Sequence, residues 1–203
     1  MDAFEFFFSF YGLLLGFSVA ELVGGFARTL HERRAVRFGL LTPLLALFVA
    51  IDIASFWNQA WVIFRPAPYS YALLILGLVV ASIFYVAATQ VFPRDYKEGD
   101  SLDDHFWSSR RLVLLSVMAA NLMVALFFVF LINLNGEAAR LKLGFAFWIG
   151  TPLFLILTAL AGVVRSRRFV TAALAILLLY QSWHIYRSAA MMVDRGGWSL
   201  IGG

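Results

Sequence analysis

The sequence predicts an all-α integral membrane protein, a bundle of six transmembrane helices with both termini outside the cytoplasm. Hydrophobic residues make up 62 % of the 203 residues and charged residues only 14 %, whereas soluble domains average about 45–50 % and 25 %. The apolar residues form runs of about 20, the length that a helix needs to cross a hydrocarbon core of roughly 30 Å. Backbone polar groups in that core must be bonded within the chain, which favours helices.

Six apolar runs qualify as spans. The first is expected to be a permanent span, because the N-terminal stretch MDAFEFFFSF lacks the basic residues of a secretory signal. Pro66 and Pro68 separate the second run from the third, and Pro152 is expected to kink the fifth. The expected spans are about 6–27, 38–64, 69–92, 112–132, 143–164 and 169–189, in one transmembrane domain of residues 1–190 that is followed by a short non-cytoplasmic tail, 191–203.

A polar segment, 93-PRDYKEGDSLDDHFWSSRR-111, precedes the fourth span. Ser101, followed three residues later by Asp104, has the spacing of a capping box and indicates the start of a helix. Asp103 and His105 flank Asp104, but consecutive residues on a helix point in different directions. We therefore expect no metal site in this cluster.

Basic residues are unevenly distributed between the two sets of loops, which predicts the orientation of the chain. The larger set follows spans one, three and five, and cytoplasmic loops carry the excess of Lys and Arg. Both termini are therefore expected outside the cytoplasm, and the compact loops favour a bacterial cytoplasmic (inner) membrane. The larger set is Arg28, Arg33, Arg34, Arg37, Arg94, Lys97, Arg110, Arg111, Arg165, Arg167 and Arg168, and the smaller is Arg65, Arg140, Lys142, Arg187 and Arg195.

Asp52 is the residue least expected in lipid. It lies near the middle of the second span, where an aspartate costs about 2.5–3.5 kcal/mol, so it should face the interior of the bundle and have a partner. Ser55 and Gln59 follow at i+3 and i+7 and extend one polar stripe along the helix. The sequence predicts a binding site centred on this stripe.

Two further spans contain ionisable residues. Glu21 lies in the inner half of the first span, seven residues before Arg28, which is a long reach for direct contact. The last span ends in 180-YQSWHIYRS-188, in which Tyr180, His184 and Arg187 are expected on one side of the helix and Gln181 beside them.

Two interpretations of these residues remain open. Glu21, Asp52 and His184 lie at three depths, and such a ladder is typical of proton relays and ion-coupled transport. Alternatively, the same residues hold helices together through hydrogen bonds, with Asp52 bonded to Gln181, Tyr180 or Asn121. Bonds of this kind average about 0.6 kcal/mol in membrane proteins.

The first span also carries a face of small residues. Gly12, Gly16, Ala20 and Gly24 recur every four residues, a spacing that allows two helix backbones to approach closely. We expect this face to contact a second protomer, which makes the protein a homo-oligomer; another span of the same chain is the alternative.

The sequence therefore predicts a small transporter or channel in which Asp52 binds a proton or cation. A non-catalytic accessory or assembly subunit of a larger membrane complex is the alternative, with another membrane protein as its partner. Neither a nucleophile–base pair nor a metal-binding motif is present, so no enzyme activity and no cofactor are expected, although a lipid-modifying enzyme stays an open third class. The net charge of +4 is spread over short loops, so the expected partner is the lipid bilayer and not nucleic acid.

Overall fold

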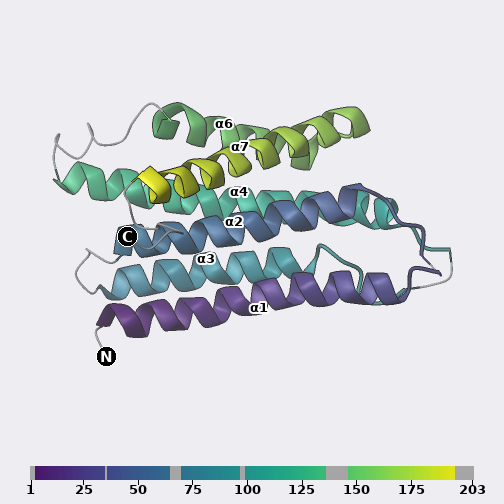
Figure 1. The fold of residues 1–203 in the computed structure, drawn as a ribbon, viewed down its shortest axis with the longest axis horizontal. Helices are drawn as coiled ribbons and strands as arrows, with labels where there is room; N and C mark the ends of the chain where they lie inside the picture. Colours follow the sequence, from purple (N-terminus) through teal and green to yellow (C-terminus); the bar gives the residue numbers. More distant parts are fainter. Residues whose placement is uncertain (1–2, 35, 65–69, 97–98, 136–145, 195–203) are drawn as a thin grey trace, which may run out of the picture.

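The computed structural model describes residues 3–34, 36–64, 70–96, 99–135 and 146–194, and these ranges contain helices and no β-strand. Successive helices run in opposite directions, so α1 begins and α7 ends at the same end of the bundle (Figure 1). The elements are α1 (Ala3–His31), α2 (Leu41–Phe64), α3 (Tyr71–Thr89), α4 (Leu102–Asn135), the π-helical turn η1 (Ala146–Gly150), α6 (Thr151–Val163) and α7 (Arg167–Asp194).

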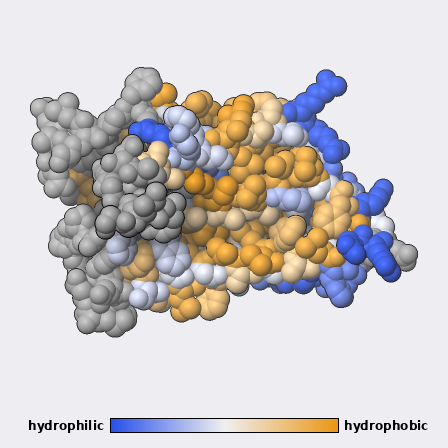
Figure 2. All heavy atoms as spheres, viewed as in Figure 1, coloured by the Kyte–Doolittle hydropathy of each residue, from blue (hydrophilic) through white to orange (hydrophobic). Residues whose placement is uncertain are grey.

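Five of the helices, α1, α2, α3, α4 and α7, are long and apolar enough to cross a membrane, and the segment Phe147–Val163 is a shorter apolar helix. Figure 2 shows apolar surface along the middle of the bundle and hydrophilic side chains at the end where α1 ends and α2 begins. The predicted all-α class is confirmed, and the helices are those of a multi-pass membrane protein.

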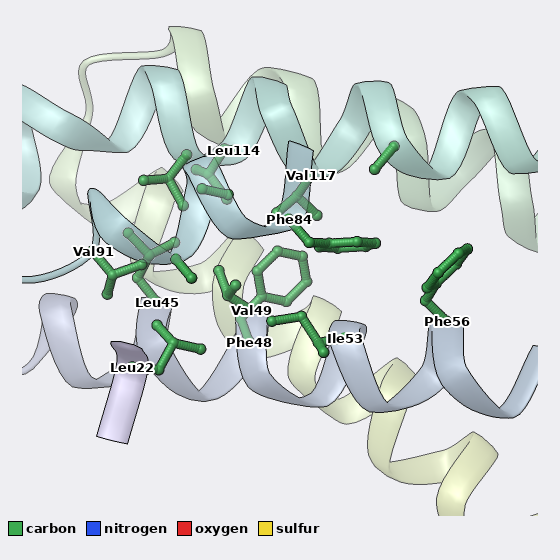
Figure 3. Packing of buried hydrophobic residues seen from close by; sticks show 14 of the residues in the cluster. Leu22, Leu45, Phe48, Val49, Ile53, Phe56, Phe84, Val91, Leu114 and Val117 are labelled. Atoms are coloured by element: carbon green, nitrogen blue, oxygen red, sulfur yellow. The ribbon is translucent and has the colours of Figure 1, made fainter. Parts of the chain in front are cut away.

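Helix α2 is the centre of the bundle. It packs against α1, α3, α4 and α7, whereas α1 and α7 lie on opposite sides of it (Figure 1). Buried apolar side chains fill the contacts, among them Phe48 and Ile53 of α2, Phe84 of α3 and Val117 of α4 (Figure 3). A polar side chain on the inner faces of α2 is therefore enclosed by other helices.

Helices α1 and α3 pack closely against each other at Gly77. The Tyr11 ring of α1 occupies the space where a Cβ at position 77 would lie. The Tyr11 hydroxyl donates to the carbonyl oxygens of Leu73 at 3.1 Å and Leu74 at 3.3 Å, so its buried polar end is satisfied. A side chain larger than hydrogen at position 77 would exclude the phenol.

Helix α4 begins nearly three turns earlier than its apolar run suggests. It begins at Leu102, directly after Ser101, where the capping-box spacing predicted a helix start, and it continues through the expected span 112–132. Arg110 and Arg111 consequently lie within the helix and not in a loop. The segment between α1 and α2 is bonded to the segment between α3 and α4. The Arg37 backbone N–H donates to the Asp100 carbonyl oxygen, and the Leu102 N–H donates to the Arg37 carbonyl oxygen.

The fifth apolar segment changes helix type along its length. The π-helical turn η1 passes directly into α6, and Pro152 occupies the first turn of α6, where its missing N–H leaves no intrahelical bond unmade. The change from π to α geometry thus lies directly before Pro152. Residues 143–145 of the expected span lie outside the described residues.

Candidate functional site

The Asp52 side chain joins three helices. It is only 4 % exposed, as expected for a charged residue that must face the interior. Oδ2 accepts a hydrogen bond of 2.6 Å from Asn121 Nδ2 of α4, and Oδ1 accepts one of 3.2 Å from Gln181 Nε2 of α7. Of the three partners that the sequence allowed, Asn121 and Gln181 are the ones in contact.

The carboxyl group has amide partners and no cationic one among the described residues. The ion pairs there join Arg28 to Glu21 and Arg167 to Asp103, away from Asp52. The short bond to Asn121, near the upper limit of about 1.7 kcal/mol, and the longer bond to Gln181, near the average of about 0.6 kcal/mol, together recover roughly 2 kcal/mol, less than the 2.5–3.5 kcal/mol that a central aspartate costs. A charged Asp52 would therefore remain only partly compensated.

The remaining members of the predicted stripe are less enclosed. Ser55 is half-buried and Gln59 is exposed, so the stripe leads from the buried carboxyl toward the surface near the end of α2. A void of about 10 Å³ lies one turn from the site and is lined by apolar residues, including Phe56 and Val124. Because it is apolar and smaller than one water molecule requires, it offers no wet path.

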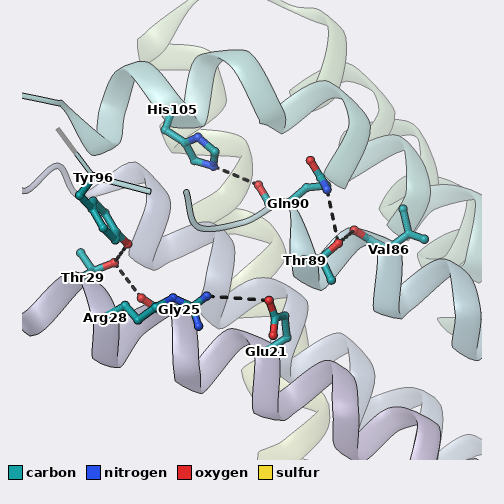
Figure 4. A network of polar contacts seen from close by, with 9 residues as sticks. All are labelled: Glu21, Gly25, Arg28, Thr29, Val86, Thr89, Gln90, Tyr96 and His105. Atoms are coloured by element: carbon teal, nitrogen blue, oxygen red, sulfur yellow. Dashed lines mark hydrogen bonds and ion pairs between the residues drawn. The ribbon is translucent and has the colours of Figure 1, made fainter. Parts of the chain in front are cut away.

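Glu21 belongs to a separate polar network at the basic end of the bundle (Figure 4). Arg28 Nη2 lies 3.8 Å from Glu21 Oε1, so the two long side chains do span the seven residues between them. Next to this pair, the Thr29 hydroxyl donates to the Gly25 carbonyl at 2.8 Å and lies 2.5 Å from the Tyr96 hydroxyl. This network ties α1 to the segment that follows α3.

The predicted cluster of Tyr180, His184 and Arg187 lies in the second half of α7, and its Tyr180 is half-buried. The Tyr180 and His184 rings meet edge to face, with their centroids 4.6 Å apart, and Arg187 lies nearby. His184 and Arg187 are exposed, whereas the neighbouring Gln181 is buried. Glu21 and His184 lie on α1 and α7, which flank α2 from opposite sides, and the contacts of the described residues do not link them through Asp52.

The face of small residues on α1 is divided between two environments. A Cβ at Gly12 would lie 2.8 Å from the Trp57 ring of α2, so this glycine permits a contact within the chain. Gly16 and Ala20 are exposed, with no neighbour within 4 Å of a Cβ at Gly16, and Gly24 faces Arg28. The expected single face for a second protomer is thus reduced to Gly16 and Ala20.

Arg110 is a buried charge that the apolar runs did not reveal. It is 4 % exposed, its Nη1 donates to the Ala161 carbonyl of α6 at 2.6 Å, and its guanidinium lies 4.5 Å from the Trp107 ring centre. The carbonyls in the last turn of a helix carry partial negative charge, which stabilises a cation there. The capping-box spacing at Ser101 is the sequence feature that could have revealed this position, because a helix that begins directly after Ser101 includes Arg110.

The larger described cavity, about 310 Å³, opens at the loop end and not at Asp52. Tyr96, Asp100, Asp104, His105 and Ser108 contribute to its lining. No group of three or more His, Cys, Asp or Glu side chains in the described part of the chain is placed to hold a metal ion.

Comparisons with protein-family models, curated proteins and solved structures gave no match. The residues around Asp52 are therefore the basis for assigning a function.

Proposed function

We propose that this chain is a small transporter or channel of a bacterial cytoplasmic membrane, in which Asp52 binds the proton or cation that is transported or that drives transport. All six apolar segments cross the bilayer, both termini are non-cytoplasmic, and the protein is a homo-oligomer. The observation that carries the proposal is a carboxyl group enclosed by α2, α4 and α7 with amide partners and no cationic one among the described residues.

The energetics support this role. Two amide hydrogen bonds offset only part of the cost of a charged aspartate at mid-membrane. Binding a proton or cation at Asp52 removes the excess charge, so the buried state of the site favours the ion-bound form. Three helices meet at the carboxyl, and small rearrangements among them would open it alternately to the two sides.

Flux measurements in reconstituted vesicles test the proposal. Wild-type protein under imposed gradients of protons, Na⁺ or K⁺ should show flux of at least one of these ions. Asp52→Asn should reduce this flux to the level of protein-free vesicles, because the amide cannot bind a proton or carry a charge. Asp104→Asn, the same change at an exposed position near the loops, should leave flux unchanged. Wild-type flux that survives Asp52→Asn would overturn the proposal.

The second function, an accessory or assembly subunit, is favoured by a different observation. The bonds of Asp52 fasten α2 to α4 and α7, which is also what a purely structural aspartate would do. On α1, Gly16 and Ala20 are exposed beside the large apolar side chains of Leu13 and Phe17, a surface suited to another membrane helix. This function predicts no flux of any ion and a fixed membrane-protein partner that copurifies in mild detergent.

A further inference from the structure

The orientation of the Asn121 amide is fixed by two bonds. Its Nδ2 donates to Asp52 Oδ2 at 2.6 Å and to the Val117 carbonyl at 3.0 Å, so both N–H groups are used. Rotating the amide by 180° would place its oxygen against two acceptors. The Asn121 oxygen therefore cannot turn toward the carboxyl, and Asp52 Oδ2 remains occupied by a donor.

The Gln181 amide has no comparable constraint. Its Nε2 donates to Asp52 Oδ1 over the longer distance of 3.2 Å. Its Oε1 is buried and accepts no hydrogen bond from the described residues, although the side chain is only 5 % exposed. Rotation of this amide by 180° would place Oε1 next to Asp52 Oδ1. The two amides at the site thus differ, one being fixed and the other free to turn.

This difference limits which ion the site can take. Among the described side chains in contact with Asp52, the oxygens that Asn121 does not hold are Asp52 Oδ1 and Gln181 Oε1, because Oδ2 accepts from Asn121. Ca²⁺ and Mg²⁺ take six or more oxygen ligands, and K⁺ requires a set of oxygens that replaces its hydration shell. A proton needs one oxygen to bind and one acceptor for the resulting O–H, and these two atoms supply both.

Other ionisable groups on the helices around α2 have their own interactions or face outward. On α1, Tyr11 donates to carbonyls of α3 and Glu21 pairs with Arg28. On α4, Arg110 is bonded to the Ala161 carbonyl. The remaining such groups, on α3, α4 and α7, are exposed or lie against other partners: Tyr71, Tyr85, Asp103, Asp104, His105, Arg111, Arg167, Arg168, Tyr180, His184, Tyr186 and Arg187.

From this geometry we infer that the ion bound at Asp52 is a proton, carried on Oδ1, and that Gln181 is the positioning residue whose amide turns to accept it. In the ionised state Gln181 Nε2 donates to Oδ1. When a proton from water binds, the new Oδ1–H donates to Gln181 Oε1, while Asn121 continues to donate to Oδ2. One O–H bond forms at the carboxylate and no covalent bond in the protein breaks. The inference rests on the proposed role of Asp52 as the ion-binding group.

Infrared difference spectroscopy on the full-length protein in lipid vesicles, between high and low pH, tests the inference. A carbonyl band of a protonated carboxyl group should appear at low pH and be lost in Asp52→Asn. Gln181→Met, which keeps the volume but removes the acceptor, should shift this band to higher frequency. Gln90→Met makes the same change at the end of α3, where the Gln90 side chain contacts Thr89 and not Asp52, and should leave the band in place.

A measurement on the unmodified chain covers the case in which Gln181→Met fails to fold. With ¹³C in the glutamine side-chain carbonyls, a glutamine band should shift together with the carboxyl band and should stop shifting in Asp52→Asn. Titration in sodium and in choline buffers should give the same midpoint. The inference would be overturned if the carboxyl band stayed unchanged in Gln181→Met and no glutamine band shifted with it, or if the titration midpoint differed between sodium and choline buffers.

The two proposals fail in different ways. A carboxyl band at Asp52 in a protein that moves no ion would contradict transport while leaving proton binding intact. Flux that depends on Asp52 but follows a sodium gradient, without a carboxyl band, would contradict the proton and Gln181 while leaving transport intact.

Discussion

The hydrogen bond between Asp52 and Asn121 should be the strongest coupling at the site. We consider the single variants Asp52→Leu and Asn121→Leu and the double variant, all measured by reversible unfolding in mixed micelles. At 2.6 Å and with its donor oriented by a second bond, this interaction belongs near the upper limit for membrane proteins, about 1.7 kcal/mol. The coupling energy between the two positions should therefore be about 1.5 kcal/mol.

The neighbouring pair supplies an internal comparison. Gln181 Nε2 lies 3.2 Å from Asp52 Oδ1 and its amide is otherwise unconstrained, so the coupling of Asp52 to Gln181 should be nearer the average of about 0.6 kcal/mol. Gln59 is exposed on α2, and Gln59→Leu should be additive with Asp52→Leu to within about 0.5 kcal/mol. A stronger coupling to Gln181 than to Asn121, or none to either, would refute the assigned geometry.

Two further predictions concern the packing that encloses the site. Gly77→Ala should lower the free energy of unfolding by about 1–3 kcal/mol, because the added methyl displaces the Tyr11 ring, whereas Gly16→Ala, which meets no atom within 4 Å, should change it little. A similar loss in both variants would argue against the close approach of α1 and α3. Arg110→Met should lower the free energy of unfolding by about 1.5–3 kcal/mol, because the charged hydrogen bond to α6 is lost. Arg111→Met, at an exposed position of α4, should have almost no effect. Equal effects of the two variants in the same unfolding assay would contradict the buried position of Arg110.

Features that follow from the free-energy cost of placing a charged side chain in lipid could be predicted from the sequence. An aspartate in the middle of an apolar run is expensive wherever the helix packs, so the inward position of Asp52 follows from energetics alone. Its partners do not follow in the same way. They depend on the rotation and relative height of α2, α4 and α7, which periodicity leaves open among Tyr180, Asn121 and Gln181.

Features that depend on packing between helices were predicted poorly. Arg110 was assigned to a loop, because its charge and that of Arg111 ended the apolar run although the helix continues through them. For the small face of α1, a second protomer was expected and another span was the alternative; Gly12 meets Trp57 of the same chain, as in the alternative. In both cases the chemistry of the side chain could be predicted, whereas the surface that it contacts depends on how the helices pack.

Reaction with a membrane-permeable carbodiimide tests most directly whether the Asp52 carboxyl group is an ion-binding group inside the bundle. This reagent modifies carboxyl groups that are protonated and reached from lipid, and mass spectrometry of the protein in vesicles locates the adduct. The account predicts an adduct on Asp52 that increases as the pH falls and disappears in Asp52→Asn. An Asp52 that stays unmodified at every pH, or that a water-soluble carbodiimide modifies as readily as exposed Asp104, would contradict it.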